Sequence, residues 1–215
     1  DKNIVTDGYG FSPNIESLII NDEGRLFASV VFDNTFYEII NEEAHPLITV
    51  DFGDYGADNS IGMEPIKEQI EYIKETNGKA LFPVLNINNS GILAFSYYFK
   101  QNTRKRFFRK SDYRQYIRFK NVDKTFHFKK ITNDLTDFPD ELFISTYFFD
   151  IGHVALYDDY LVDIVLPSKY LLSNSEKTKI NTKELGEISI NDNPIIVLIK
   201  LKQELLWFTK TLKTH

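Results

Sequence analysis

"SLIINDEGRLFASVVFD", residues 17–33, places an apolar run on each side of a polar segment, and this arrangement decides the fold class. The polar segment runs from Asn21 to Gly24 and contains residue types that favour tight reversals of the chain. The pattern predicts two antiparallel strands joined by a turn. Two further strand-like runs follow at once, "TFYEII" (35–40) and "PLITVDFG" (46–53). We therefore expect four consecutive antiparallel strands here.

The same kind of unit recurs along the chain. "ALFPVLNINNSGILAFSYYF" (80–99) and "YRQYIRFKNVDKTFHFKK" (113–130) each predict a strand, a turn and a strand. In a looser third unit, 142–167 supplies two or three strands and "PIIVLIKLK" (194–202) a final one. Between them, the polar stretch 167–188 is expected to be mixed helix and loop. Repeated four-stranded antiparallel units are typical of β-propeller blades, although three units are too few to close a ring.

One segment interrupts the strands. "EPIKEQIEYIKETNG" (64–78) has a proline near its start, isoleucines at helical spacing and a terminal glycine, which predicts a short amphipathic helix. The expected fold is therefore all-β, with antiparallel four-stranded blades of β-propeller type and this short inserted helix. We expect a single domain, 1–215. It would hold about three blades, at about 14–56, 80–134 and 140–202. A C-terminal tail, 203–215, would follow them.

Composition excludes some classes of function. The 215 residues include 18 Phe and 12 Tyr, as befits a strand-rich globular protein, and no Cys. Disulfides, thiol catalysis and thiolate metal sites are therefore ruled out. No apolar run approaches the roughly 20 residues of a membrane helix. The chain begins "DKNIV" without a methionine, so we expect a trimmed N-terminus from which an export signal could have been removed.

"TRKRFFRK" (103–110) belongs to a strongly basic segment on an acidic body. Residues 100–120 carry nine Lys or Arg against one acid, Asp112, while the rest of the chain has a net charge of −14. If 113–120 is a strand, Ile117 and Phe119 share its inward face with Gln115, and the basic side chains form a solvated outer row. The candidate binding residues are Arg104, Lys105, Arg106, Arg109, Arg114 and Arg118.

Three interpretations of this basic segment remain open. The first is the solvated edge of an outer blade strand. The second is a contact surface for an anionic partner, which would be an acidic protein surface, an anionic polysaccharide or lipid headgroups. The third is a nucleic-acid site. The last is the least favoured, because stacking platforms for bases need exposed aromatic rings. On the strand that would follow Asn121, we expect Phe126 and Phe128 to match the inward face and His127 the basic one.

Other motifs carry little chemistry. "DFG" (51–53) lacks the partner motifs of a protein kinase, so a turn that uses Gly53 and Gly56 is the better interpretation. The acidic clusters in "DFGDYGADNS" (51–60) and "NDLTDFPDE" (133–141) do not have the spacing of an EF-hand, and we expect turns rather than metal sites. Asp150 and His153 are the one pair we name as candidate acid and base catalysts. No cofactor is expected.

Three stretches together resemble the six-bladed β-propeller proteins of Bacteroides-type bacteria. They are "TFYEIINEEAHPLITVDFGDYG" (35–56), "YIRFKNVDKTFHFKKITNDL" (116–135) and "NDNPIIVLIKLK" (191–202). The resemblance covers most of 15–202 and implies a propeller fold and export, usually as a lipoprotein facing the periplasm or the cell surface. Members of that family have about twice as many residues, so the chain is similar to their C-terminal half. The family has no accepted catalytic residues to carry over.

These observations favour a non-catalytic binding or scaffold module of an exported bacterial β-propeller protein. A propeller-based lyase or hydrolase acting on glycans, with Asp150 and His153 as its catalytic pair, is the alternative. Expected partners are a protein or an anionic polysaccharide, and unpaired blades could also associate with each other. A membrane contact would come only from a lipid anchor upstream of Asp1, and the sequence does not identify the ligand.

Overall fold

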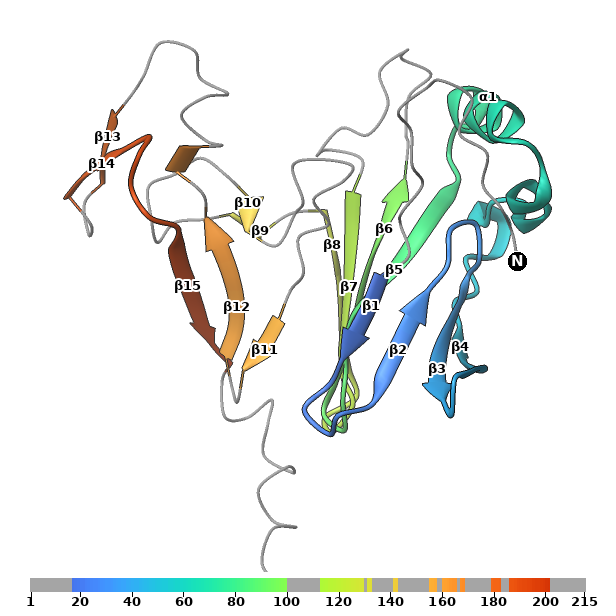
Figure 1. The fold of residues 1–215 in the computed structure, drawn as a ribbon, viewed down its shortest axis with the longest axis horizontal. Helices are drawn as coiled ribbons and strands as arrows, with labels where there is room; N and C mark the ends of the chain where they lie inside the picture. The colour runs from blue at the N-terminus through green and yellow to red at the C-terminus, as the bar shows by residue number, and fades with distance from the viewer. Residues whose placement is uncertain are drawn as a thin grey trace, which may run out of the picture.

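The computed structural model describes residues 17–99, 113–129, 131–132, 141–142, 155–157, 160–165, 167–168, 179–182 and 186–201. These residues form antiparallel β-sheets and one α-helix (Figure 1). The expectation of an all-β fold with four-stranded antiparallel sheets and a short inserted helix is confirmed at this level. Within the described ranges, no helix is both long enough and apolar enough to span a membrane.

The first sheet is a meander of four strands in chain order. Its strands are β1 (Ser17–Ile20), β2 (Leu26–Ser29), β3 (Thr35–Ile40) and β4 (Glu43–Thr49). β4 begins three residues earlier than its apolar run suggested, because Asn41 and Glu42 form a two-residue turn with φ angles of 51° and 67°. Pro46 lies within β4, which is an edge strand, where a missing N–H donor is tolerated.

A short connection separates the first two sheets. It contains two 3₁₀ turns, η1 (Gly53–Tyr55) and η2 (Asn59–Met63), and the helix α1 (Ile66–Glu75), which the helical spacing of 64–78 predicted. Gly53 has a φ of +54° and accepts the turn conformation expected of it, whereas Gly56 has an ordinary φ of −63°. The prediction that both glycines serve unusual backbone geometry was therefore wrong for Gly56.

The second sheet repeats the four-stranded meander. Its strands are β5 (Ala80–Asn88), β6 (Ile92–Phe99), β7 (Tyr113–Phe119) and β8 (Lys124–Phe128). The β7–β8 register pairs Ile117 with Phe126 and Gln115 with Phe128, as the alternation of residues 113–130 predicted. Gln115, Ile117 and Phe119 are buried, so the inward face of β7 is confirmed, whereas Phe126 on β8 is 46% exposed.

The third sheet joins strands that are distant in sequence. It has the order β11 (Ala155–Tyr157), β12 (Tyr160–Val165) and β15 (Ile195–Lys200). Two small pairs flank it, β9 (Ile131–Thr132) with β10 (Glu141–Leu142) and β13 (Lys179–Thr182) with β14 (Gly186–Ser189). The hairpin β13–β14 overlaps the stretch 167–188, for which the sequence predicts mixed helix and loop, so that prediction is wrong at the two strands of the hairpin.

The three sheets pack in sequence, with the second between the other two (Figure 1). One core cluster joins the first and second sheets, and its members include Phe27 and Phe36 from the first and Leu85, Phe95 and Tyr97 from the second. Another cluster covers the opposite face of the second sheet and joins it to the third. Its members include Ile87, Ile92, Ala94, Ile117 and Phe119 on one side and Leu161, Ile188, Val197 and Leu201 on the other.

The initial strands of the three sheets lie close together. β5 contacts β1 and β2 of the first sheet and β11 of the third. All residues of β5 are buried, whereas β4 and β8, the last strands of their sheets, are largely exposed. The sheets therefore converge at their first strands and diverge toward their last ones.

Candidate functional site

The hairpin turns of the first two sheets gather at one end of the molecule, which we call the turn end. Figure 1 places the β1–β2, β5–β6 and β7–β8 turns at the lower end of the strands and α1 at the upper end. Asn21 in the first of these turns donates a hydrogen bond from Nδ2 to the carbonyl oxygen of Asn88, at 3.1 Å. The turn end is thus one connected surface rather than a set of separate loops.

Asparagine side chains fix the shape of two of these turns. Asn21 Oδ1 accepts hydrogen bonds from the main-chain N–H groups of Glu23 and Arg25, at 3.0 and 2.9 Å. Asn89 Oδ1 does the same for Gly91 and Ile92, at 3.0 and 2.7 Å. Such side-chain bonds replace part of the backbone pairing that a turn loses. The side chains carried by these turns are therefore held on a rigid frame.

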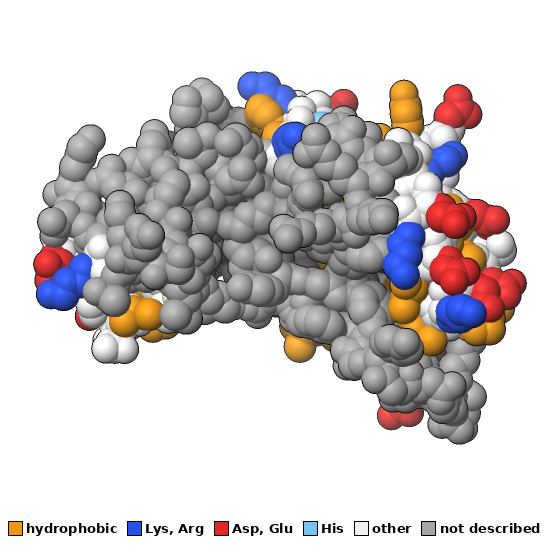
Figure 2. All heavy atoms as spheres, turned by 90° about the horizontal axis from the view of Figure 1, so that it is seen from above, with side chains coloured by type: hydrophobic (Ala, Val, Ile, Leu, Met, Phe, Trp, Pro, Cys, Tyr) orange, Lys and Arg blue, Asp and Glu red, His pale blue; other side chains and the backbone are white. Residues whose placement is uncertain are grey.

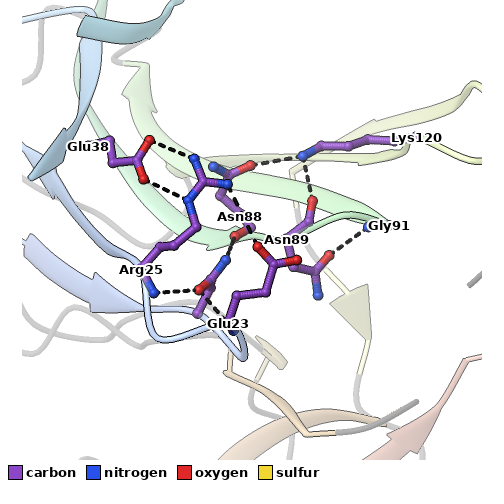
Figure 3. A network of polar contacts seen from close by, with 8 residues as sticks. Glu23, Arg25, Glu38, Asn88, Asn89, Gly91 and Lys120 are labelled. Atoms are coloured by element: carbon purple, nitrogen blue, oxygen red, sulfur yellow. Dashed lines mark hydrogen bonds and ion pairs between the residues drawn. The ribbon is translucent and has the colours of Figure 1, made fainter. Parts of the chain in front are cut away.

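Lys120 is held in place at the turn end by hydrogen bonds to the β5–β6 turn (Figure 3). Its Nζ donates to Asn88 Oδ1 at 2.9 Å and to the carbonyl oxygen of Asn89 at 2.6 Å, and its main-chain N–H donates to Gly91 at 2.8 Å. Partial burial, with the positive charges of Arg25 and Arg118 nearby, lowers the pKa of Lys120 below its ordinary value of 10.5. The orientation of this ammonium group is therefore fixed before any ligand binds. Its charge is not neutralised by these two acceptors, so an anionic ligand could pair with it.

Arg25 stands beside Lys120 and is anchored by a carboxylate. Its Nε and Nη2 donate to the two carboxylate oxygens of Glu38, both at 2.6 Å (Figure 3). This two-point hydrogen bond lowers the pKa of Glu38 and raises that of Arg25. Glu23 lies near the same guanidinium, with an oxygen 3.8 Å from Nη1. Arg25 is thus held in one orientation while 44% of its side chain stays exposed.

Arg118 completes the set of three cations. It lies on β7 next to the β7–β8 turn and donates from Nη2 to Asp123 Oδ1 at 2.8 Å, with both side chains largely exposed. An exposed pair of this kind contributes little to stability, so it exchanges readily with another anion. The candidate site is therefore Arg25, Arg118 and Lys120 on a frame formed by Asn21, Asn88 and Asn89.

The opposite end of the molecule has a different character. Figure 2, a view from above, shows Asp and Glu side chains gathered with some Lys or Arg at the α1 end. In α1, Glu68, Glu71 and Glu75 alternate with Lys67 and Lys74. With three glutamates against two lysines, α1 carries a small net negative charge.

The structure separates the basic residues that the sequence grouped together. Arg118 is exposed and belongs to the turn end, but Arg114 is only 8% exposed and its guanidinium lies 5.7 Å from the centre of the Phe99 ring. The expectation that both belong to a solvated row was wrong for Arg114, because its part of β7 lies under the core between the first two sheets. Arg104, Lys105, Arg106 and Arg109 fall outside the described residues, so their role stays a prediction.

The candidate catalytic pair, Asp150 and His153, also lies outside the described residues and stays a prediction. A different histidine makes a close contact: His127 Nε2 is 2.6 Å from the Tyr97 hydroxyl, and the two rings stack with centroids 5.7 Å apart. Tyr97 is 8% exposed, and burial raises the pKa of its hydroxyl. We assign this pair to packing, since a reacting group has to reach its substrate.

Two of the three aspartates in 51–60, Asp51 and Asp58, hydrogen-bond to the backbone of their turns, as expected. Asp51 Oδ1 accepts the N–H of Gly53 at 2.7 Å, and Asp58 Oδ1 accepts the N–H of Ser60 at 2.9 Å, which lowers the pKa of Asp58. In the part of the chain that the structure describes, no group of three or more His, Cys, Asp or Glu side chains could hold a metal ion. Most of the acidic cluster at 133–141 lies outside that part.

Sequence patterns did not single out Arg25 or Lys120 as site residues. Lys120 was counted within the basic segment, and Arg25 follows the first predicted turn directly. The available signal for this site was that a cation lies next to each of two predicted turns, Arg25 after 21–24 and Lys120 before 121–124. The link between the turns was not visible in the sequence, because Asn21 and Asn88 are 67 residues apart and meet only when the two sheets pack.

Comparisons with known proteins give one structural likeness. No family model and no curated protein matches the chain. A crystal structure from Bacteroides fragilis, of a protein named only for its inferred export, aligns with a TM-score of 0.50 and 13% sequence identity. The alignment covers 86% of this chain and 49% of that one, so this chain spans about half the length of the protein it matches. At this identity the likeness concerns the fold.

Proposed function

We propose that this chain is part of a non-catalytic binding or scaffold module of an exported bacterial β-propeller protein, and that its turn end binds an anionic polysaccharide. The propeller architecture is supported by two successive four-stranded meanders, by the face-to-face packing of three sheets and by the convergence of β1, β5 and β11. Export, to the periplasm or the cell surface, rests on the family resemblance of 35–56, 116–135 and 191–202.

The position of Lys120 carries the proposal for the ligand. Two hydrogen bonds to neutral oxygens orient its ammonium group, whereas the neighbouring Arg25 and Arg118 are each paired with a carboxylate. The amide side chains of the frame and the guanidinium of Arg25 offer directional donors, which suit carboxylate or sulfate groups along a sugar chain. The rigid turns lower the entropic cost of binding, because little of the surface has to be ordered when the ligand arrives.

Binding to polysaccharides of different charge tests this function. We expect the chain to bind polygalacturonate or chondroitin sulfate and not neutral dextran, with an affinity that falls as salt is added. Lys120→Gln should weaken binding roughly tenfold, because a hydrogen bond to a charged group contributes about 1.5 kcal/mol or more. Isothermal titration calorimetry of the wild type and the variant measures both effects.

The controls separate the site from general charge. Lys67→Gln removes the same charge from the exposed face of α1 and should leave the affinity unchanged. Arg118→Gln should weaken binding without loosening the turns, since Arg118 pairs only with exposed groups among its described contacts. Equal losses for Lys67→Gln and Lys120→Gln, or no binding to either acidic polysaccharide, would contradict the proposed ligand class.

A further inference from the structure

Each end of the stack of sheets exposes an apolar face. The outer face of the first sheet, which we call the first face, is formed by Leu18, Ile20, Leu26, Ala28, Tyr37 and Ile39. The strand registers place them in two rows, Leu18 beside Ala28 and Tyr37, and Ile20 beside Leu26 and Ile39. The intervening residues Phe27 and Phe36 point the other way, into the core shared with the second sheet. The first face therefore points away from the rest of the described chain.

The third sheet has a matching face at the other end of the stack. Ile196 and Leu198 of β15, with Val162 of β12 beside Leu198, form what we call the last face. The alternate residue Val197 is 5% exposed and packs in the core shared with the second sheet. Since side chains alternate along a strand, Ile196 and Leu198 point away from that core.

Each face combines strongly exposed side chains with half-buried ones, the latter being Leu26, Ala28, Tyr37 and Ile39 on the first face and Val162 on the last. Leu18 and Ile20 are 61% and 72% exposed, and Ile196 and Leu198 are 64% and 55% exposed. Single exposed apolar residues are common on protein surfaces, but contiguous rows on a sheet face mark an interaction surface. The inward faces of the same two sheets are buried against the second sheet. Within the described residues, the first face and the last face are thus the two sheet faces of the stack that no other sheet covers.

We propose that a second copy of this chain covers both faces, its last face docking on the first face and its first face on the last. The packing is the one that the chain already uses twice, an apolar sheet face against the next sheet. The initial strands converge, so successive sheets turn about a common line, and two copies related by a two-fold axis engage both faces at once. The aligned Bacteroides fragilis chain is about twice as long, which is the amount of chain that two copies supply.

The pairing is head to tail, and this makes it testable with two variants. Ile20→Arg places a charge on the first face and Leu198→Arg on the last face, and neither residue is buried, so both variants should fold. Met63→Arg introduces the same charge at a residue that is 77% exposed and lies on neither face. Circular dichroism and thermal unfolding check that each variant keeps the native structure.

Light scattering after size-exclusion chromatography gives the mass in solution. The wild type and Met63→Arg should show twice the chain mass of 25.1 kDa, and each face variant should be monomeric, with dimerisation weakened roughly tenfold or more. An equimolar mixture of Ile20→Arg and Leu198→Arg should recover a dimer, because one interface remains intact. A wild type that stays monomeric up to its solubility limit overturns the proposal. So does a dimer that only one variant disrupts and that mixing does not restore, since this indicates like-on-like pairing.

Discussion

Replacement of Phe36 by alanine is expected to lower the free energy of unfolding by about 3–5 kcal/mol. Phe36 lies on the inner face of the first sheet with 0% of its surface exposed, and its ring centre is 5.5 Å from that of Phe95 on β6. The Phe95 ring in turn stacks on Tyr116 of β7, with centroids 4.7 Å apart. Removing the Phe36 ring leaves a cavity where the first two sheets meet, and the sheets cannot close it without moving.

Urea denaturation followed by circular dichroism measures this loss. Phe126→Ala is the matched control, because it removes the same side chain from β8, where 46% of it is exposed. The control should lose only a fraction of what Phe36→Ala loses. Similar losses for the two variants would show that the first two sheets do not share a packed core at Phe36, and would remove the support for a stack of sheets.

Arg114→Ala is expected to cost about 2–3 kcal/mol of stability, although arginine at a surface is usually replaced at little cost. The side chain is buried to 8% exposure and its guanidinium lies over the Phe99 ring. Both the packing of its stem and the attraction between cation and ring are lost, the latter contributing about 0.5–2 kcal/mol. Arg114→Lys should recover part of the loss, because it keeps a charge and a long stem.

Arg118→Ala provides the control on the same strand and the same face. Its ion pair with Asp123 is exposed, and such pairs contribute about 0–1 kcal/mol. Thermal unfolding of Arg114→Ala, Arg114→Lys and Arg118→Ala distinguishes a structural arginine from a surface one. If Arg114→Ala were as stable as Arg118→Ala, the solvated row expected from the sequence would be the better description.

The strands and their pairing could be predicted where the information was local. Alternation of side chains fixed the inward face of β7, and the turn residues at 121–124 fixed the reversal after it, so the β7–β8 register came out correctly. The two-residue turn after β3 was not predicted, because neither Asn41 nor Glu42 is a glycine and no local pattern indicates that both adopt positive φ angles. The β13–β14 hairpin was missed because its strands are short and polar.

Two features depend on contacts between sheets: the burial of Arg114 and the assembly of the turn end. Alternation assigns Arg114 and Arg118 to one face of β7 but does not say where along the strand the first sheet covers that face. The core near Tyr116 and Phe99 covers it at Arg114 and leaves it open at Arg118. Likewise, Arg25 and Lys120 come together only when Asn21 meets Asn88. These contacts join residues that are far apart in the sequence, so they can be identified only in the folded chain.

Hydrogen–deuterium exchange with and without saturating polygalacturonate tests most directly whether the turn end is the binding surface. We predict slower exchange in the three turns at 21–25, 88–91 and 118–123, and unchanged exchange in α1, at the opposite end of the strands. Protection of α1 instead of these turns, or no protection at 118–123 where Lys120 lies, would contradict the proposed function.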